Sequence, residues 1–220
     1  MSKFLILTFF LLISSLCSAA TKFKLWVPFT LTGNYGLVLY NIEPQLRLIY
    51  ADNPFQQFLN NSGIGYQLSP HWQAWIGQTL SADSQDAVPG SADEYRIWQQ
   101  IVGTRSLTHS RIVSRTRLEE RKSFNFPDMA YRLRERVTWS TPLTPILAFV
   151  LYDEVFINLD TASWIITHAL DQNRAYIGLE QKLSTTTYLS AGYLNQFINF
   201  VTNPQLDSVL VINIRVNLDT

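Results

Sequence analysis

Arginine residues at alternate positions are the groups in this sequence best suited to chemistry. Arg132, Arg134 and Arg136 are spaced by two residues, and Arg115 and Arg117 repeat that spacing in an earlier segment. Side chains spaced by two lie on the same face of a β-strand. Guanidinium groups form bidentate pairs with carboxylates and with phosphate. The pattern therefore predicts a basic sheet face suited to ion-pair networks or to anion recognition.

The polar faces of the expected strands carry more basic than acidic side chains. Five acids accompany eleven bases there, although the whole chain has 17 of each sign. In one interpretation, ladders of Arg, Glu and Gln brace a narrow, filled barrel. In the other, the positive excess makes a site or passage for anions such as phosphorylated or carboxylated solutes. The residues of this charge cluster are Glu43, Arg47, Glu94, Arg96, Arg115, Arg117, Glu119, Arg121, Arg132, Arg134, Arg136, Glu154, Arg174, Glu180, Lys182 and Arg215.

Nucleophilic catalysis has one weak candidate set. A hydrolase of this kind needs a Ser or Thr nucleophile, a His base and an orienting acid or amide. Of His71, His109 and His168, only His168 lies in a long link, near Ser163 and Asp171. No glycine-containing nucleophile motif surrounds these serines. We therefore name no catalytic residue and keep a lipid-modifying hydrolase as an alternative.

Metal and cofactor sites are not indicated. The histidines lack ligand spacing, and the single cysteine, Cys17, falls in a segment that we expect to be removed. Asp83, Asp86 and Asp93 could recruit a divalent cation from lipopolysaccharide, but a solvated acidic loop explains them better. Phosphate-binding loops and dinucleotide fingerprints do not occur. We expect no metal and no cofactor.

The first twenty residues have the features of a secretory signal peptide. Lys3 precedes an apolar stretch of about 13 residues, Phe4 to Leu16, which is too short for a spanning helix. Small residues at Ser18-Ala19-Ala20 suit a signal peptidase, so we expect cleavage after Ala20 and a single domain over 21–220. The near-neutral charge of that domain argues against nucleic-acid binding.

Period-two alternation dominates the rest of the chain. The longest apolar run, Ile146–Tyr152, is far shorter than a spanning helix. Segments rich in Val, Ile, Leu, Thr and aromatic residues recur between turn signals, as β-strands do. We expect strands at about 23–31, 37–50, 56–69, 71–80, 93–103, 110–121, 130–140, 146–159, 171–183, 186–198 and 207–218.

The connections and faces of these segments indicate a membrane barrel. Tight turns at about 69–71, 106–109, 141–145 and 184–185 alternate with longer links at about 81–92, 122–129, 160–170 and 199–206. Short turns at one end and longer loops at the other are typical of up-and-down membrane barrels. Trp72 and Trp139 flank short turns, where interface aromatics are found. Arginine also dominates the polar faces, so we predict polar side chains inward and aliphatic ones toward lipid.

Several short motifs, taken in order, resemble a known family. They are Trp26 and the runs Pro44–Arg47, Gly65–Leu68, Glu94–Gln100, Ser114–Arg121, Tyr131–Arg134, Tyr152–Asn158 and Asp171–Arg174. Together they are similar to a family of uncharacterised outer-membrane β-barrels of Gram-negative bacteria, catalogued as a domain of unknown function. The resemblance spans essentially all of 21–220. It implies a location and a fold, and no activity.

The expected fold is all-β, a single up-and-down antiparallel transmembrane barrel of about 10–12 strands with a polar lumen. Bacterial single-chain barrels have even strand numbers, whereas the sequence offers eleven segments. In a ten-stranded barrel, residues 23–31 would have no assigned place in the wall. The chain also ends in Leu218-Asp219-Thr220, without the terminal aromatic residue that such barrels often have.

We expect a porin-like protein of the outer membrane, either structural or a channel for small anions or other solutes. Its surroundings would be outer-membrane lipid and lipopolysaccharide, and its biogenesis partners periplasmic chaperones and the barrel-assembly machinery. A soluble periplasmic barrel that binds an apolar ligand is the other alternative. It requires Arg132, Arg134 and Arg136 to point outward.

Overall fold

A computed structural model describes residues 22–50, 54–83 and 93–218. No helix in these ranges has the length and hydropathy needed to span a bilayer. The expected signal peptide, with Cys17, lies outside the described residues. All eleven expected segments are confirmed as strands: β1 (Phe23–Tyr35), β2 (Val38–Ile49), β3 (Phe55–Ser69), β4 (Trp72–Asp83), β5 (Glu94–Ser106), β6 (Arg111–Ser123), β7 (Met129–Thr144), β8 (Leu147–Asn158), β9 (Thr167–Lys182), β10 (Thr187–Phe200) and β11 (Gln205–Leu218).

The described strands close into one barrel of eleven. Each strand pairs antiparallel with its neighbour in sequence, and the barrel closes where β1 runs parallel to β11, with Trp26 opposite Val211 and Phe29 opposite Ile214. The count lies within the expected range of 10–12 strands, but it is odd and not even, and the wall is not wholly antiparallel as expected. The first and last strands of an odd up-and-down series point the same way, so they can close the barrel only as a parallel pair. The segment at 23–31 needs no unseen partner.

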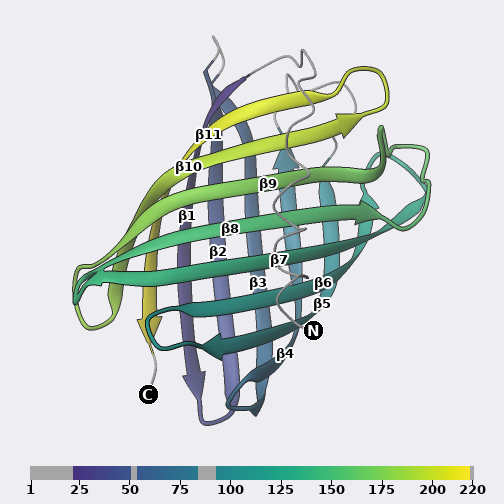
Figure 1. Ribbon diagram of the computed structural model, residues 1–220. Coiled ribbons are helices and arrows are strands. Elements are labelled where there is room, and N and C mark those ends of the chain that lie inside the picture. Colours follow the sequence, from purple (N-terminus) through teal and green to yellow (C-terminus); the bar gives the residue numbers. More distant parts are fainter. Residues whose placement is uncertain (1–21, 51–53, 84–92, 219–220) are drawn as a thin grey trace, which may run out of the picture.

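The two ends of the barrel differ in their connections. Short turns at 36–37, 70–71, 107–110, 145–146 and 183–186 lie at one end, at the lower left of Figure 1. The other end carries the links at 124–128, 159–166 and 201–204, and there β2 and β4 end and β3 and β5 begin. The stretches between strands at this end are mostly longer in sequence. Three boundaries differ from expectation by four residues each, because β1 continues to Tyr35, β7 continues to Thr144, and β9 begins at Thr167. Trp72 begins β4 directly after a turn, whereas Trp139 lies well inside β7, edge-on to Phe149.

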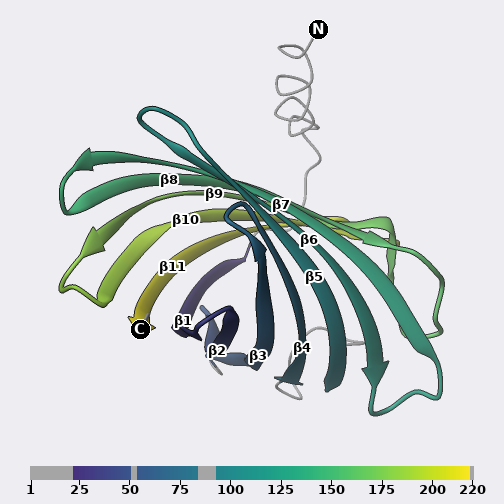
Figure 2. The same cartoon turned by 90° about the horizontal axis from the view of Figure 1, so that it is seen from below.

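The wall separates polar from apolar side chains. Arg132, Arg134 and Arg136 line the interior, together with most of the polar residues of the other strands. Large apolar side chains such as Ile177 and Leu179 are exposed on the outside. The apolar-ligand alternative predicted the opposite facing. The strands wrap round the interior at a strong tilt, so that β7–β11 cross in front of β1–β4 in Figure 1, and Figure 2 views the same wall from below.

Two glycines make room for a large ring on the inner wall. Trp98 is fully buried, and its indole lies over Gly63 of β3 and Gly77 of β4. A Cβ at these glycines would lie 2.5 and 2.3 Å from atoms of the ring. The missing side chains therefore let Trp98 lie against the backbone, and its Nε1 donates to Thr79 at 3.2 Å. This contact fixes the surface on which Arg117 rests.

Candidate functional site: an arginine-rich cavity

A cavity of about 660 Å³ occupies the barrel interior. All eleven described strands contribute lining side chains, and residues Trp164 to Ile166 of the β8–β9 link line it as well. The cavity has the size of sites that hold small organic ligands. Most of its charged groups come from β5 to β9.

A continuous chain of ion pairs crosses β6 to β9. Arg132 donates to Asp171 at 2.8 Å and to Glu119 at 2.6 Å. Arg134 donates to Glu119 at 2.6 Å and to Glu154 at 2.7 Å. Arg115 adds a further ion pair to Glu154. Because Glu119 is completely buried, its charge depends on these guanidinium groups for compensation.

Further ion pairs lie outside this chain. Glu94 accepts from Arg96 at 2.6 Å and from Arg121 at 2.7 Å. Lys24 of β1 and Asp207 of β11 are buried 2.6 Å apart, so they join the two strands that close the barrel. Arg215 and Glu180 form a more exposed pair at 2.9 Å. All of these pairs except Glu94–Arg96 join different strands of the wall.

Four arginines are less completely paired and rest on aromatic rings. Arg117 lies 3.9 Å from Glu119 and Arg174 lies 4.0 Å from Glu154. No carboxylate of the described residues comes within 4.0 Å of Arg47 or Arg136. Stacking on a ring fixes a guanidinium plane and leaves its edge free to donate hydrogen bonds. The guanidinium-to-centroid distances are 4.0 Å for Arg47 over Trp26, 3.9 Å for Arg117 over Trp98, 5.0 Å for Arg136 over Tyr152, and 4.9 and 4.5 Å for Arg174 over Trp26 and Phe156.

The residues of the predicted charge cluster come together in this interior, with one exception. Fourteen line the cavity directly, and Glu119 is buried behind them. Lys182 is the exception, since it is exposed at the end of β9. Sequence reasoning missed Lys24, Asp83, Asp171 and Asp207, all of which face inward near strand ends. Among the described residues the lumen thus holds eleven bases and eight acids, an excess smaller than predicted.

A family model described as "Protein of unknown function (DUF2490)" matches residues 23–207, from the start of β1 to the start of β11. The chain belongs to this family. An uncharacterised protein of Methylorubrum extorquens is 28% identical over 227 residues, which cover 94% of this chain and 96% of the relative. The resemblance to a family of unknown function is thereby confirmed, and neither description names an activity.

In this member of the family, the candidate hydrolase residues are not brought together. Asp171 pairs with Arg132 and accepts from Thr167, while Ser163 donates its backbone N–H to Asp128. His168 is exposed at the start of β9. The described residues show no hydrogen bond that would link the His168 side chain to either partner, as a relay requires.

The aspartates considered as ligands of a divalent cation make different hydrogen bonds in the structure. Asp83 accepts from Ser81 at 3.1 Å inside the barrel, and Asp93 accepts the Asp83 backbone N–H at 2.9 Å. Asp86 lies outside the described residues. Within the described ranges no group of three or more His, Cys, Asp or Glu could hold a metal ion.

The β8–β9 link covers part of the cavity at the long-loop end. Trp164 is buried there against Ala130 and Ala162, and its Nε1 donates to the Asp128 carbonyl at 3.2 Å. Hydrogen bonds from the Ser163 hydroxyl and backbone N–H lower the pKa of the Asp128 carboxyl. The β6–β7 link therefore anchors the β8–β9 link at this end of the barrel.

Proposed function

We propose that this protein is an outer-membrane β-barrel of a Gram-negative cell, exported by its signal peptide, whose lumen is selective for small anions. The observation that carries the proposal is the partition of the wall, with arginines inside and large aliphatic side chains outside. A soluble barrel exposes few contiguous apolar surfaces of this extent. A lipid-facing wall requires them.

The exposed apolar side chains support the membrane part of the proposal. They occur on every described strand except β6, from Phe29 in β1 to Ile214 in β11. Closure of the barrel also leaves no sheet edge, and a structure in hydrocarbon must satisfy all of its backbone groups internally. An odd strand number is compatible with a membrane-spanning barrel, since a mitochondrial outer-membrane channel also has one.

The surplus of cationic groups supports the anion part. Eleven bases and eight acids among the described inward residues leave three positive charges in a confined space. Such a lumen attracts anions and repels cations. The ion-pair chain is not in conflict with this function, because it holds the remaining arginines in place.

Fractionation and single-channel recording test the two parts separately. The protein should stay with outer membranes until detergent is added and migrate on gels in a heat-modifiable way. Release by osmotic shock without detergent would contradict the membrane location. In planar bilayers with a salt gradient, the reversal potential should show anion preference. Cation preference, or no conductance at all, would overturn the anion-selective lumen.

A further inference from the structure

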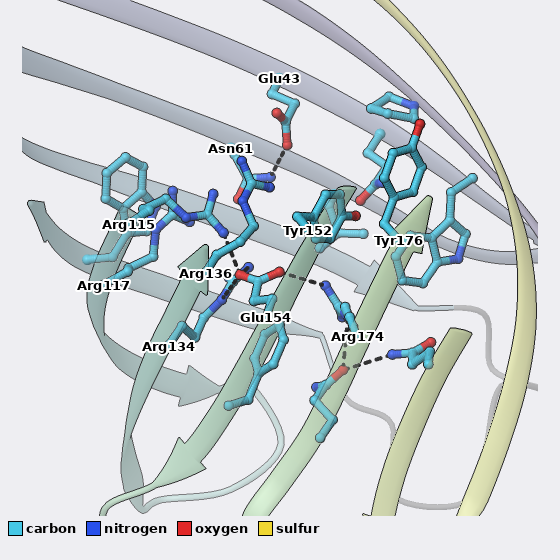
Figure 3. A pocket seen from close by; sticks show the side chains of 18 of the residues that line it. Glu43, Asn61, Arg115, Arg117, Arg134, Arg136, Tyr152, Glu154, Arg174 and Tyr176 are labelled. Atoms are coloured by element: carbon cyan, nitrogen blue, oxygen red, sulfur yellow. Dashed lines mark hydrogen bonds and ion pairs between the residues drawn. The ribbon is translucent and has the colours of Figure 1, made fainter. Parts of the chain in front are cut away.

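The strongest concentration of incompletely paired positive charge lies where β6 meets β7. Arg115 and Arg136 are directly opposite in the register of these strands, and Arg117 is opposite Arg134. Like charges placed directly opposite destabilise a sheet unless something compensates them. Figure 3 shows Arg115, Arg117, Arg134 and Arg136 gathered on one side of Glu154.

The nearby carboxylates are already engaged. Glu154 accepts from both Arg115 and Arg134. Glu119 accepts from Arg134, at 2.6 Å, and from Arg132. Arg136 makes no ion pair within 4.0 Å to any described carboxylate, although Glu154 is its neighbour in the register. At least two positive charges of this group therefore lack a full counter-charge.

The free donors of this group are fixed in direction. Arg117 lies 3.9 Å above Trp98 and donates its Nε to Gln100 at 2.8 Å, while its Nη1 lies 3.9 Å from Glu119, too far for a hydrogen bond. Arg136 is held over Tyr152. The buried Nε of Arg115 has no acceptor among the described residues. Three guanidinium groups on neighbouring strands thus present donors that need oxygen acceptors.

A phosphoryl group has the chemistry that this arrangement requires. It carries about −1.5 to −2 charge at neutral pH and three strong acceptor oxygens, which matches at least two unmatched positive charges. Planar guanidinium groups recognise it bidentately. The cavity is much larger than one phosphoryl group, and the facing wall offers polar side chains for an organic remainder. There Thr30 and Asn61 hydrogen-bond to Glu43, and Thr30 also contacts Asn213.

We propose that Arg115, Arg117 and Arg136 form a binding site for a phosphoryl group inside the lumen. The proposal rests on the anion-selective lumen proposed above and assigns it a ligand class. Free phosphate and the phosphoryl group of a small phosphorylated solute share the chemistry that these residues recognise. A doubly charged oxyanion should bind at this site. Chloride should enter the lumen without occupying a defined site.

Calorimetric titration of the purified protein in detergent micelles tests the site, with inorganic phosphate and glycerol 3-phosphate as separate probes at constant ionic strength. Saturable binding of either probe is expected. Tighter binding of glycerol 3-phosphate assigns the site to a phosphorylated solute, and equal or weaker binding assigns it to free phosphate. Absence of saturable binding for both probes overturns the proposal.

Two variants make the test specific. Arg136→Gln removes a guanidinium that has no described ion pair, so the fold should persist while phosphate affinity falls by about 10-fold or more. Arg215→Gln removes a lumen charge from the separate pair with Glu180 and should leave phosphate affinity within about 2-fold. Equal losses in both variants would show diffuse attraction and overturn the site.

The outcomes also separate this site from the proposed function. Anion-selective conductance without phosphate binding overturns the phosphoryl site and leaves the proposed function standing. Phosphate binding that is lost in Arg136→Gln, in a barrel without conductance, supports the site and overturns the channel.

Discussion

Glu119 of β6 and Arg132 of β7 face each other directly in the register of the two strands, and Arg132 Nε and Nη2 lie 2.9 and 2.6 Å from one oxygen of Glu119. Arg134 approaches the other oxygen at 2.6 Å. A completely buried carboxylate is thus shared between two guanidinium groups. It is the central acid of the ion-pair chain.

Glu119→Gln should destabilise the barrel strongly. Loss of the carboxylate leaves Arg132 and Arg134 buried with less compensation, and breaking a buried pair costs about 3–5 kcal/mol. Unfolding in denaturant, followed by the heat-modifiable gel shift, measures the loss. Glu180→Gln is the matched control, since its pair with Arg215 is partly exposed and should contribute about 0–1 kcal/mol. Similar losses in the two variants would contradict the central role of Glu119.

Gly77→Ala should also destabilise the barrel, for a steric reason. The added Cβ would lie 2.3 Å from the Trp98 ring and 2.4 Å from the Ser62 carbonyl oxygen, so the backbone itself resists the change. Overpacking of this kind costs about 1–3 kcal/mol. In Gly103→Ala the closest atom is 2.9 Å away, on the Trp72 side chain, and the loss should be smaller. Equilibrium unfolding of both variants checks the order.

The closing pair of strands can be tested by thiol cross-linking. In the parallel register Leu25 is opposite Leu210, and Phe29 is opposite Ile214. Cysteines at either pair should react with a short bifunctional reagent in the folded protein. The exchanged pairs, Leu25 with Ile214 and Phe29 with Leu210, are displaced by four residues, or about 13 Å, and should not. Cross-linking of the exchanged pairs instead would show antiparallel closure.

The sequence predicts the individual strands of the barrel better than it predicts how the first and last strands pair. Strands such as β7 and β9 are found by alternation because one of their faces is aliphatic. In β1, bulky apolar residues occur on both faces, with Trp26 inward and Phe29 outward, so its facing could not be predicted. Its parallel pairing with β11 joins the two ends of the chain, which no local pattern reports.

The types of residue that face the interior could be predicted from the sequence, but the contacts between them could not. Spacing by two places Arg115 and Arg117 on one face, but it does not reveal that Arg117 lies over Trp98 of the neighbouring strand. Asp171 was missed as a lumen acid because it lies beside the irregularity in the pairing of β8 with β9. Such a register shift depends on both strands and cannot be derived from one of them.

The anchor of the β8–β9 link should respond to pH. Because hydrogen bonds from Ser163 lower the pKa of Asp128, its carboxylate persists below the ordinary aspartate value of about 3.9. The contribution to loop order should therefore be present at neutral pH and lost as the pH falls through the lowered pKa. Amide hydrogen exchange at Ser163, expressed as a protection factor, measures it. In Asp128→Ala the protection should be low at every pH, and unchanged protection there would remove Asp128 as the anchor.

Three acidic side chains of the described strands, Glu120, Glu135 and Asp153, interrupt the apolar outer wall, and each accepts a hydrogen bond from a polar group on a neighbouring strand. Glu135 accepts from Thr116 of β6. Asp153 accepts from Asn173 of β9 at 3.0 and 3.1 Å. If lipid surrounds this wall, Asp153→Leu alone leaves the Asn173 amide with only the long contact to the Glu154 carbonyl, at 3.4 Å, and should cost about 1–3 kcal/mol. The double variant Asp153→Leu, Asn173→Leu removes both polar groups and should regain that stability in lipid vesicles, or exceed that of the unmodified protein. A double variant less stable than the single one would show that polar surroundings, and not lipid, contact this part of the wall.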